Sequence, residues 1–410
     1  MAERSWHERS LEEALTQPAL RAGLRRALGA GPLCDRCLGR LCAAVDTGLS
    51  NERRGQAIRR ALDAAPPGKS CWLCGGLFFD VDAWVSRALA ALEGWEFDTF
   101  LVASHTDPKI EDRENVLHEL AGDHLAEPYK QEFNREVGAR LCDATGAEPD
   151  FTHPDIVVIA DHARGSVAAE VRPLFVSGRY RKLVRGIPQC RWAAWPSSVQ
   201  QIIGDVVCEA AQGEDHLFHG CGREDVDVRC LGERPFVLEV VRPRRRRLDW
   251  AEIADRINHS GAVEVLDLGR CGADDVARIK MLRPDKTYRA LVRLDDPVGP
   301  PCSERLAGLV GRIRQRTPTR VLRRRPDRVR WRQVRSIVWR QLDCRTLEME
   351  VRTEAGLYVK ELVSGDGGRT QPNVAGVLGA DAECAELDVL AVHTEEPTAT
   401  EKPQSSSATE

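Results

Sequence analysis

The stretch GCGREDVDVRCLGERPFVLEV, residues 220–240, joins a charged turn to a strand pattern and sets the fold class of the chain around it. Its second half, RPFVLEV, is short and rich in apolar and β-branched residues, which predicts a buried β-strand. Residues 223–229 hold two aspartates and two arginines together with Glu224. An aspartate here could be a nucleophile that its neighbours keep ionised, or the charges could simply pair across a strand. These residues alone support both interpretations equally.

Further short segments of β-branched residues, bounded by turn residues, extend this pattern along the chain. They are AVEVLDLGRC, KTYRALVRL, RSIVWRQL, TLEMEVRTE and AGLYVKELV, and we expect helices at WAEIADRIN and SERLAGLVGRIRQ between them. This order predicts an α+β domain over residues 179–393, with a mixed, mainly antiparallel sheet and flanking helices. Residues 394–410 are polar and rich in Pro, Ser and Thr, so we expect a disordered tail there.

Two smaller regions precede this domain. Residues 1–95 are predicted to be mostly helical, and they end in DAWVSRALAALEG, whose apolar residues share one helical face. Residues 96–178 predict a small α/β module with a strand at 99–105, a helix at 129–146 and two further strands joined by a polar turn. This module has neither a metal-ligand set nor a Gly-rich phosphate loop.

Fourteen cysteines occur in the chain, and two pairs of them have the spacing of metal-binding knuckles. Cys34 and Cys37 form one CxxC pair, and Cys71 and Cys74 form the other. Two such knuckles supply the four thiolates that zinc binds tetrahedrally. A predicted helix over residues 50–65, with its first serine as N-cap, separates them. We therefore predict a structural zinc site, with four unrelated buried thiols as the alternative.

Charge is unevenly distributed along the chain. The formal net charge is −4, yet 51 of the 59 basic residues are arginines, which bind phosphates in a bidentate manner and stack on bases. Residues 312–340 hold twelve arginines and a single acidic residue. A partner that is an anionic polymer explains this cluster better than the alternative, an ordinary solvated surface encoded by a GC-rich genome.

Missing motifs narrow the range of functions. No apolar run approaches the ~20 residues of a membrane span, and the charged N-terminus does not resemble a signal peptide, so we expect a soluble, cytoplasmic protein. The sequence has no GxxxxGK[ST] loop, no strand–GxGxxG–helix unit, no GxSxG elbow and no HExxH motif. We therefore expect no catalytic cofactor, and we also expect a monomer.

GREDVDVR resembles the catalytic motif of the pseudouridine synthases, which keep an Asp in settings such as G-R-T-D. The longer string, continued through RPFVLEV, is similar to the archaeal and eukaryotic THUMP-containing tRNA pseudouridine synthase family that acts on the TΨC arm, at positions 54 and 55. LCDRCLGR and CWLCGG resemble that family's zinc knuckles. EFNREVGARL, PDIVVIAD and VRPLFVSGRYRKLVRGIPQCRW resemble its THUMP-containing region, and KTYRALV and GLYVKELVSGDGGRTQPNVAGVLG its later catalytic motifs. The resemblance implies a pseudouridine synthase fold for residues 179–393, a THUMP-like RNA-binding module for 96–178 and a zinc-knuckle region for 1–95.

The resemblance also implies roles for single residues. Asp225, which follows G-R-E, would be the catalytic nucleophile, and Asp227 would be the fallback, better suited to pairing with an arginine. Four residues would bind the target uridine: Tyr288, Tyr358, Lys360 and Leu362. Lys360 would pair with the catalytic carboxylate and Leu362 would pack beneath the base, both on a strand beside the Asp225 loop.

The implied substrate is tRNA, with a uridine isomerised at position 55 and with position 54 as a further candidate. Phosphate contacts would come from residues 312–340 and from the run Arg244, Arg245, Arg246 and Arg247. The point of attack, ribose C1′ or uracil C6, stays open. Two alternatives also stay open: an RNA-binding adaptor without catalysis, and a THUMP-bearing enzyme with another chemistry, such as methylation or thiolation.

Overall fold

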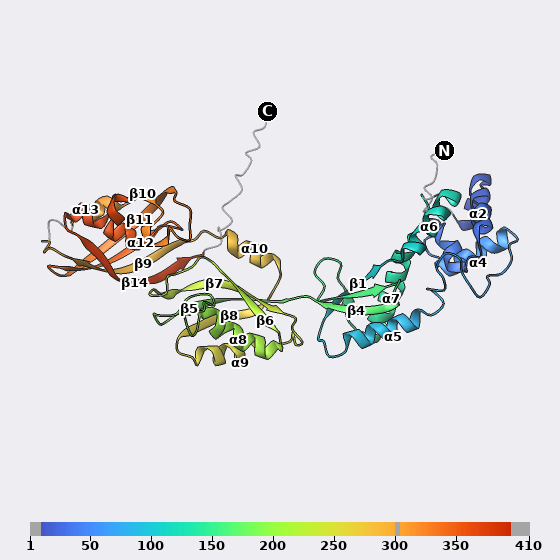
Figure 1. The fold of residues 1–410 in the computed structure, drawn as a ribbon, viewed down its shortest axis with the longest axis horizontal. Helices are drawn as coiled ribbons and strands as arrows, with labels where there is room; N and C mark the ends of the chain where they lie inside the picture. Colours follow the sequence, from blue (N-terminus) through green and yellow to red (C-terminus); the bar gives the residue numbers. More distant parts are fainter. Residues whose placement is uncertain (1–9, 123, 300–303, 395–410) are drawn as a thin grey trace, which may run out of the picture. The chain divides into compact units, whose positions relative to one another are not determined.

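The computed structural model describes residues 10–122, 124–299 and 304–394 (Figure 1). The chain divides into two compact units, Met1–Arg172 (unit 1) and Pro173–Glu410 (unit 2). Both units combine helices with a sheet, so the α+β prediction is confirmed. Within the described ranges, no helix is both long and apolar enough to span a membrane. The predicted tail lies outside the described residues except for Thr394.

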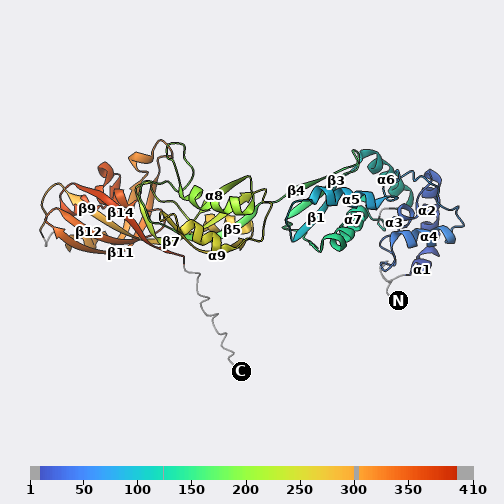
Figure 2. The same cartoon turned by 90° about the horizontal axis from the view of Figure 1, so that it is seen from below.

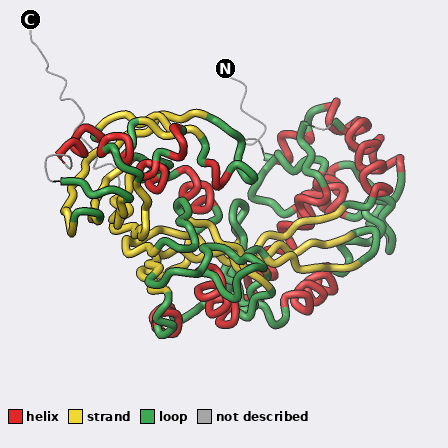
Figure 3. The backbone as a smooth tube through the Cα atoms, turned by 60° about the vertical axis from the view of Figure 1, so that its left-hand side comes forward, coloured by secondary structure: helices red, strands yellow, loops and turns green. Residues whose placement is uncertain are grey.

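Unit 1 begins with a run of helices (Figure 3). They are α1 (Leu11–Leu15), α2 (Pro18–Ala30), α3 (Asp35–Arg40), α4 (Asn51–Ala61) and α5 (Val81–Leu92). Ser50 caps α4 as predicted, because its side chain accepts a hydrogen bond from the Arg53 backbone amide at 3.3 Å. A Cβ added at Gly39 or Gly55 would lie 1.8 or 1.9 Å from a backbone oxygen in the facing segment. These two glycines therefore allow α3, which carries the first knuckle, to pack directly on α4.

The rest of unit 1 is a sheet packed against helices. In chain order it contains β1 (Thr99–His105), α6 (Pro108–Ala121), α7 (Tyr129–Thr145), β2 (Glu148–Pro149), β3 (Ile156–Asp161) and β4 (Ser166–Val171). The strand order is β2-β1-β3-β4, with β1 parallel to β3 and β4 antiparallel to β3. The predicted apolar face of α7 is confirmed, since Phe133, Val137 and Leu141 are buried. Gly146 ends this helix in the left-handed conformation, with φ +71°.

Unit 2 is built on one continuous sheet. Its strands are β5 (Leu174–Lys182), β6 (Asp215–Gly220), β7 (Arg229–Val241), β8 (Val263–Cys271), β9 (Asp285–Leu294), β10 (Gly311–Arg316), β11 (Val329–Asp343), β12 (Thr346–Thr353), β13 (Thr370–Gln371) and β14 (Ala382–His393). They lie in the order β13-β10-β11-β12-β9-β14-β7-β5-β8, with β6 beside β7. Figure 2 shows β9, β11, β12 and β14 side by side. Within this sheet, the described strands pair antiparallel except β14 and β7, which run parallel where Asp388 faces Arg229.

Separate apolar cores support the two halves of this sheet. α8 (Val199–Ala211) and α9 (Trp250–Asn258) bury Ile203, Val207 and Ile257 against β5, β7 and β8. In the other half, η2 (Glu304–Leu309), α12 (Val359–Ser364) and α13 (Val374–Leu378) pack against β9–β12. The short turns η3 (Thr319–Val321) and η4 (Asp366–Gly368) contribute no buried residue to this core. α10 (Asp274–Met281) contacts β6 and β7. The pairing of β14 with β7 therefore joins the two halves of the sheet, each of which has its own apolar core.

The predicted strand AGLYVKELV is wrong, because this segment contains helix α12. Val359, Leu362 and Val363 are all buried, and their spacing of three and four residues is helical. Burial of this face outweighs the β-branched composition that suggested a strand. Gly365 ends the helix with φ +79°.

The predicted helix SERLAGLVGRIRQ is also wrong in its described part, residues 304–315. It forms the 3₁₀ turn η2 and then strand β10. In β10, Ile313 and Gln315 are buried and alternate with arginines that are less buried, which is the two-residue period of a strand. The expected domain boundary at residue 178 falls inside β5, whose whole length pairs in the sheet of unit 2.

Candidate active site

The Asp225 loop, residues 221–228, leads into β7 at the point where β7 pairs with β14. The loop borders a cavity of about 610 Å³ within unit 2. Leu387 and Val389 of β14 form part of its wall, and further lining comes from β9, η3, β11 and the start of α12. Three of the predicted binding residues, Tyr288, Tyr358 and Lys360, line this cavity together with Asp225. The fold thus brings together motifs that lie far apart in the sequence.

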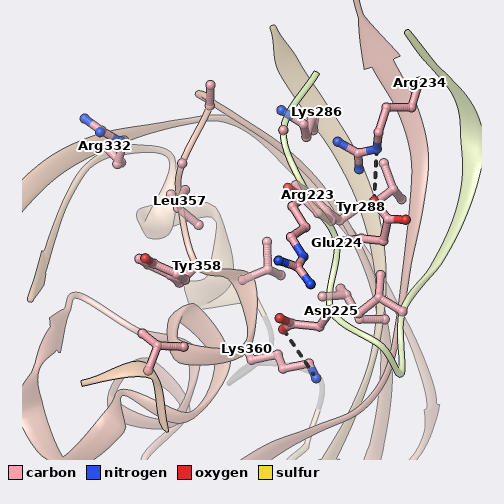
Figure 4. A pocket seen from close by; sticks show the side chains of 18 of the residues that line it. Arg223, Glu224, Asp225, Arg234, Lys286, Tyr288, Arg332, Leu357, Tyr358 and Lys360 are labelled. Atoms are coloured by element: carbon pink, nitrogen blue, oxygen red, sulfur yellow. Dashed lines mark ion pairs between the residues drawn. The ribbon is translucent and has the colours of Figure 1, made fainter. Parts of the chain in front are cut away.

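Two basic side chains flank the Asp225 carboxylate. Arg320 Nη1 lies 2.9 Å from Asp225 Oδ2. Lys360 Nζ lies 3.9 Å from the same oxygen (Figure 4). Glu361 holds Arg320 in place, since Arg320 Nε is 2.6 Å from Glu361 Oε1. Burial lowers the pKa of the Arg320 guanidinium, but the carboxylates of Glu361 and Asp225 outweigh burial and raise that pKa. Both cations therefore pair with the Asp225 carboxylate at the wall of the cavity.

Asp227 has a different environment from Asp225. Its partner is Lys360, whose Nζ lies 2.6 Å from Asp227 Oδ2, instead of the expected arginine. Burial raises the pKa of the Asp227 carboxyl, but the hydrogen bond and charge of Lys360 outweigh burial and lower that pKa. The Asp227 side chain is largely exposed and is not among the described residues that line the cavity. Asp225 is therefore the better placed carboxylate.

A fully buried ion pair lies directly behind the Asp225 loop. Arg234 Nε is 3.1 Å from Glu224 Oε2, and each side chain is 1% exposed. The Tyr180 hydroxyl donates to Glu224 Oε1 at 3.0 Å, and Arg234 Nη1 donates to the Cys221 carbonyl at 2.8 Å. Burial lowers the pKa of the Arg234 guanidinium, but the charge of Glu224 outweighs burial and raises that pKa. This cluster fixes the loop at its first residue, Cys221, and at Glu224, the residue before Asp225.

Lys182 holds the same loop through its backbone. Its ammonium donates to the carbonyl oxygens of Ile187 at 2.8 Å, Asp225 at 3.1 Å and Val226 at 3.1 Å. The residue is 0% exposed, and burial lowers the pKa of its ammonium group. Three hydrogen bonds to carbonyls use all three donors of a lysine. Lys182 therefore anchors the main chain at Asp225 without contacting its carboxylate.

Of the four predicted substrate-binding residues, three line the cavity and Leu362 does not. Tyr288 on β9 lines the cavity, and burial raises its pKa to about 12. Gln315 fixes the backbone of Tyr358, donating to its carbonyl and accepting from its amide, both at 2.9 Å. Leu362 is fully buried in the core and is not among the described lining residues, whereas Leu357 is. A role for Leu362 beneath the base stays a prediction.

Arginines surround the cavity, and most of them lie in stretches that the sequence analysis singled out for their charge. Those that line it are Arg223, Arg234, Arg283, Arg320, Arg324, Arg325, Arg330 and Arg332, and five of these belong to the segment 312–340. The run 244–247 contributes none of the described lining residues. Arg246 in that run is 3% exposed, so it is left out of the proposed phosphate contacts. Glu361 and Lys182 were missed because their partners are distant in sequence, and Arg320 was predicted only as part of the basic segment 312–340, without its contact to Asp225.

The four knuckle cysteines meet in unit 1. Their sulfur atoms all lie within 4.8 Å of one another, and all four residues are buried. Cys34 caps α3, and its backbone amide donates to Cys71 Sγ at 3.3 Å. Arg40, itself buried, lies with Nη2 3.6 Å from Cys37 Sγ and with Nη1 3.0 Å from Glu132 Oε2. A compact buried set of four thiols with a neighbouring cation fits a Zn²⁺ ion bound by thiolates.

Two known domain families match most of the chain. The family model described as Pus10, C-terminal, matches residues 175–393, and the model described as Pus10 THUMP domain, archaeal, matches residues 84–161. The tRNA pseudouridine synthase Pus10 of Halorubrum lacusprofundi is 41% identical over 411 aligned residues, covering 90% of this chain and 96% of that relative. The chain belongs to the Pus10 family. The resemblance that the sequence motifs predicted is thereby confirmed.

Other Pus10 relatives are about equally similar. The Pus10 of Pyrococcus furiosus is 40% identical over 380 aligned residues, covering 90% of this chain and 96% of the relative. The Pus10 C-terminal match begins at the second residue of β5 and ends with β14, so it spans the sheet of unit 2.

A chain from a crystal structure of a Cbf5–Nop10–Gar1 complex aligns with a TM-score of 0.32 and 20% identity, covering 52% of this chain and 47% of that one. That likeness is too weak to add to the Pus10 assignment.

Proposed function

We propose that this chain is a tRNA pseudouridine synthase that isomerises a uridine in the TΨC arm, at position 55 first and at position 54 as a second candidate. The observation that supports this most directly is the Asp225 carboxylate, placed in a cavity between Arg320 and Lys360. The cavity lies within the region that matches the Pus10 C-terminal model. Its volume falls in the roughly 300–1,000 Å³ range of ligand sites.

The proposed reaction rearranges one nucleotide without a co-reactant. The target uridine leaves the base stack, and basic and aromatic groups at the cavity offset the loss of stacking. Asp225 attacks ribose C1′ or uracil C6 and forms a covalent bond to that carbon, and the bond between C1′ and N1 breaks. The uracil turns in the cavity and its C5 bonds to C1′. The bond to Asp225 breaks, C5 loses its proton and N1 takes up a proton, which restores the ring and the free carboxylate. Reactants and product have the same atoms, so no oxidant, reductant or phosphate donor is needed.

The remaining groups of the cavity would orient the RNA. Arg320 and Lys360 would orient Asp225 through their ion pairs, and Tyr288 and Tyr358 would offer flat faces to the base. The exposed arginines of the segment 312–340 would contact phosphates, in which case RNA affinity falls steeply as salt rises. Arg244, Arg245 and Arg247 remain proposed as weaker, peripheral contacts.

The test is pseudouridine mapping on an unmodified tRNA transcript incubated with the full chain. We expect new pseudouridine in the TΨC loop, and the mapped position assigns 54 or 55. An RNA-binding adaptor would retain the transcript without producing pseudouridine. A modifying enzyme of another chemistry would leave the loop unchanged until a group donor was added.

Replacing Lys182 with Met should slow the reaction without weakening RNA binding. The substitution removes three hydrogen bonds that position the main chain at Asp225. Because a displacement of about 1 Å can lower a rate by roughly 100-fold, we expect kcat to fall between tenfold and about 100-fold. Single-turnover rates and Kd for the transcript measure the two effects separately. If RNA affinity fell by the same factor while the single-turnover rate stayed unchanged, a positioning role for Lys182 would be contradicted.

We propose further that Cys34, Cys37, Cys71 and Cys74 hold a structural Zn²⁺ ion. Metal analysis of the full chain should find about one zinc per molecule, and Cys34→Ala should abolish it. Because metal binding supplies folding free energy, the same variant should lower the melting temperature of unit 1. Cys42→Ala is the matched control: Cys42 is equally buried in unit 1 but lies outside the cluster. Zinc retained in Cys34→Ala would refute the proposed ligand set.

A further inference from the structure

Trp192 is an aromatic residue of the cavity to which the proposed mechanism gives no role. It lies between β5 and α8 and lines the cavity with Asp225, yet 38% of its surface is exposed. Trp84, a tryptophan with an ordinary packing role in unit 1, is only 7% exposed. Trp192 therefore lies where the cavity opens to solvent, with apolar surface left uncovered.

A guanidinium group accompanies this indole. Arg324 Cζ lies 4.8 Å from the centroid of the Trp192 ring, and Arg324 also lines the cavity. At this distance the guanidinium is attracted to the face of the ring. An indole and a guanidinium plane are the two kinds of surface on which unpaired nucleobases stack. The pair thus offers a flat, cationic platform at the opening of the cavity.

The backbone beneath Trp192 is firmly anchored. Gln189 is buried, and its Nε2 donates to the Gly222 carbonyl at 2.9 Å, which ties this segment to the Asp225 loop. Arg191 Nη1 lies 3.1 Å from Asp215 Oδ1, and the Arg191 amide donates to Gln200 Oε1 at 3.1 Å. A platform held at a fixed position beside the nucleophile loses little entropy when it binds a base.

We propose that Trp192, backed by Arg324, stacks on a nucleobase adjacent to the target uridine and so holds the strand while the uridine enters the cavity. The proposal rests on the proposed RNA substrate and assigns Trp192 a binding role, with no part in bond breaking. The surrounding arginines suffice to hold a phosphate, whereas the flat face of the indole suits a partner that is itself flat, such as a nucleobase.

The test is a double-mutant cycle on binding. Kd is measured in the Asp225→Asn background, so that the RNA stays unconverted, using a fluorescently labelled tRNA transcript. The transcript is either intact or carries one abasic nucleotide at position 54 or 56, the neighbours of position 55. We expect Trp192→Ala to weaken binding of the intact RNA by roughly tenfold, and Trp192→Phe to retain most of the affinity.

The abasic transcripts decide between stacking and indirect effects. If Trp192 stacks on one neighbouring base, removing that base weakens RNA binding to the Asp225→Asn protein, the parent of this series, by roughly tenfold. The same removal should change Kd little when Trp192→Ala is also present. Trp331→Ala is the matched control, because Arg312 also lies 4.8 Å from its ring and the ring is 50% exposed, yet Trp331 does not line the cavity. It should keep the parent's sensitivity to the abasic nucleotide.

Two results would overturn the proposal. One is that the loss in Kd from Trp192→Ala and the loss from an abasic nucleotide multiply independently at both position 54 and position 56. The other is that Trp192→Ala binds the intact RNA as tightly as the Asp225→Asn protein does. Pseudouridine formation by the wild-type chain is assayed on the same intact transcript. Absence of product there refutes the proposed enzymatic function, while the binding cycle reports on the stacking contact in either case.

Discussion

Asp225→Asn should reduce pseudouridine formation by at least roughly a thousandfold, the scale of losing a catalytic nucleophile. Asparagine keeps the size of the side chain and can still accept a hydrogen bond from Arg320, which lies 2.9 Å from Asp225 Oδ2. It lacks the negative charge required for attack on carbon. We expect RNA affinity to change little, so that the loss appears in the single-turnover rate and not in Kd.

Asp227→Asn is the matched control for this experiment. Asp227 has the same charge on the same loop, but it pairs with Lys360 at 2.6 Å and lies largely in solvent. Because exposed ion pairs contribute about 1 kcal/mol or less, we expect its rate to stay within about tenfold of the wild type. If Asp227→Asn were inactive and Asp225→Asn active, Asp227 would be the nucleophile and the assignment to Asp225 would be wrong. Full activity in both variants would exclude an aspartate nucleophile in this loop.

Arg234→Met should lower the free energy of unfolding of unit 2 by about 3–5 kcal/mol. The substitution leaves the Glu224 carboxylate buried and uncompensated, since both partners of this pair are 1% exposed. A buried charge without its partner carries the full desolvation penalty. Urea unfolding of the full chain, with separate probes for the two units, measures the change.

Two further variants check the cause of this effect. Glu224→Gln with Arg234→Met should be less destabilised than the sum of the single changes, because no unpaired charge remains. Arg340→Met is the exposed counterpart: Arg340 Nη2 lies 3.0 Å from Glu348 Oε1, but its side chain is 71% exposed. We expect this variant to change the free energy of unfolding by less than about 0.5 kcal/mol. Equal destabilisation of Arg234→Met and Arg340→Met would rule out burial as the cause.

The short-range features of the chain could be predicted from its sequence. The period of apolar residues located α7, because Phe133, Val137 and Leu141 repeat every four residues and bury one face. The CxxC spacing identified the four cysteines that converge in unit 1. The GREDVDVR motif singled out Asp225 by its resemblance to a family of known chemistry, and the cavity beside it holds Tyr288 and Lys360 from the other quoted motifs.

The failures have a common physical origin in contacts between distant segments. α12 was expected as a strand because its composition favours one, but burial of Val359, Leu362 and Val363 against the core selected a helix. Arg246 belongs to a run that looks uniformly exposed, yet the fold buries it. In both cases tertiary packing outweighed local composition.

The residue types of the site can be read directly from the sequence: a carboxylate in a charged turn, paired thiols and an excess of arginine. Which of these residues meet depends on the folded chain. Arg320 reaches the Asp225 carboxylate because the parallel pairing of β7 with β14 joins the two halves of the sheet. Lys182 reaches the backbone carbonyl of Asp225 because β5 pairs with β7. The charge of a side chain is written in the sequence, but its partner is set by strand register and burial, which depend on the whole chain at once.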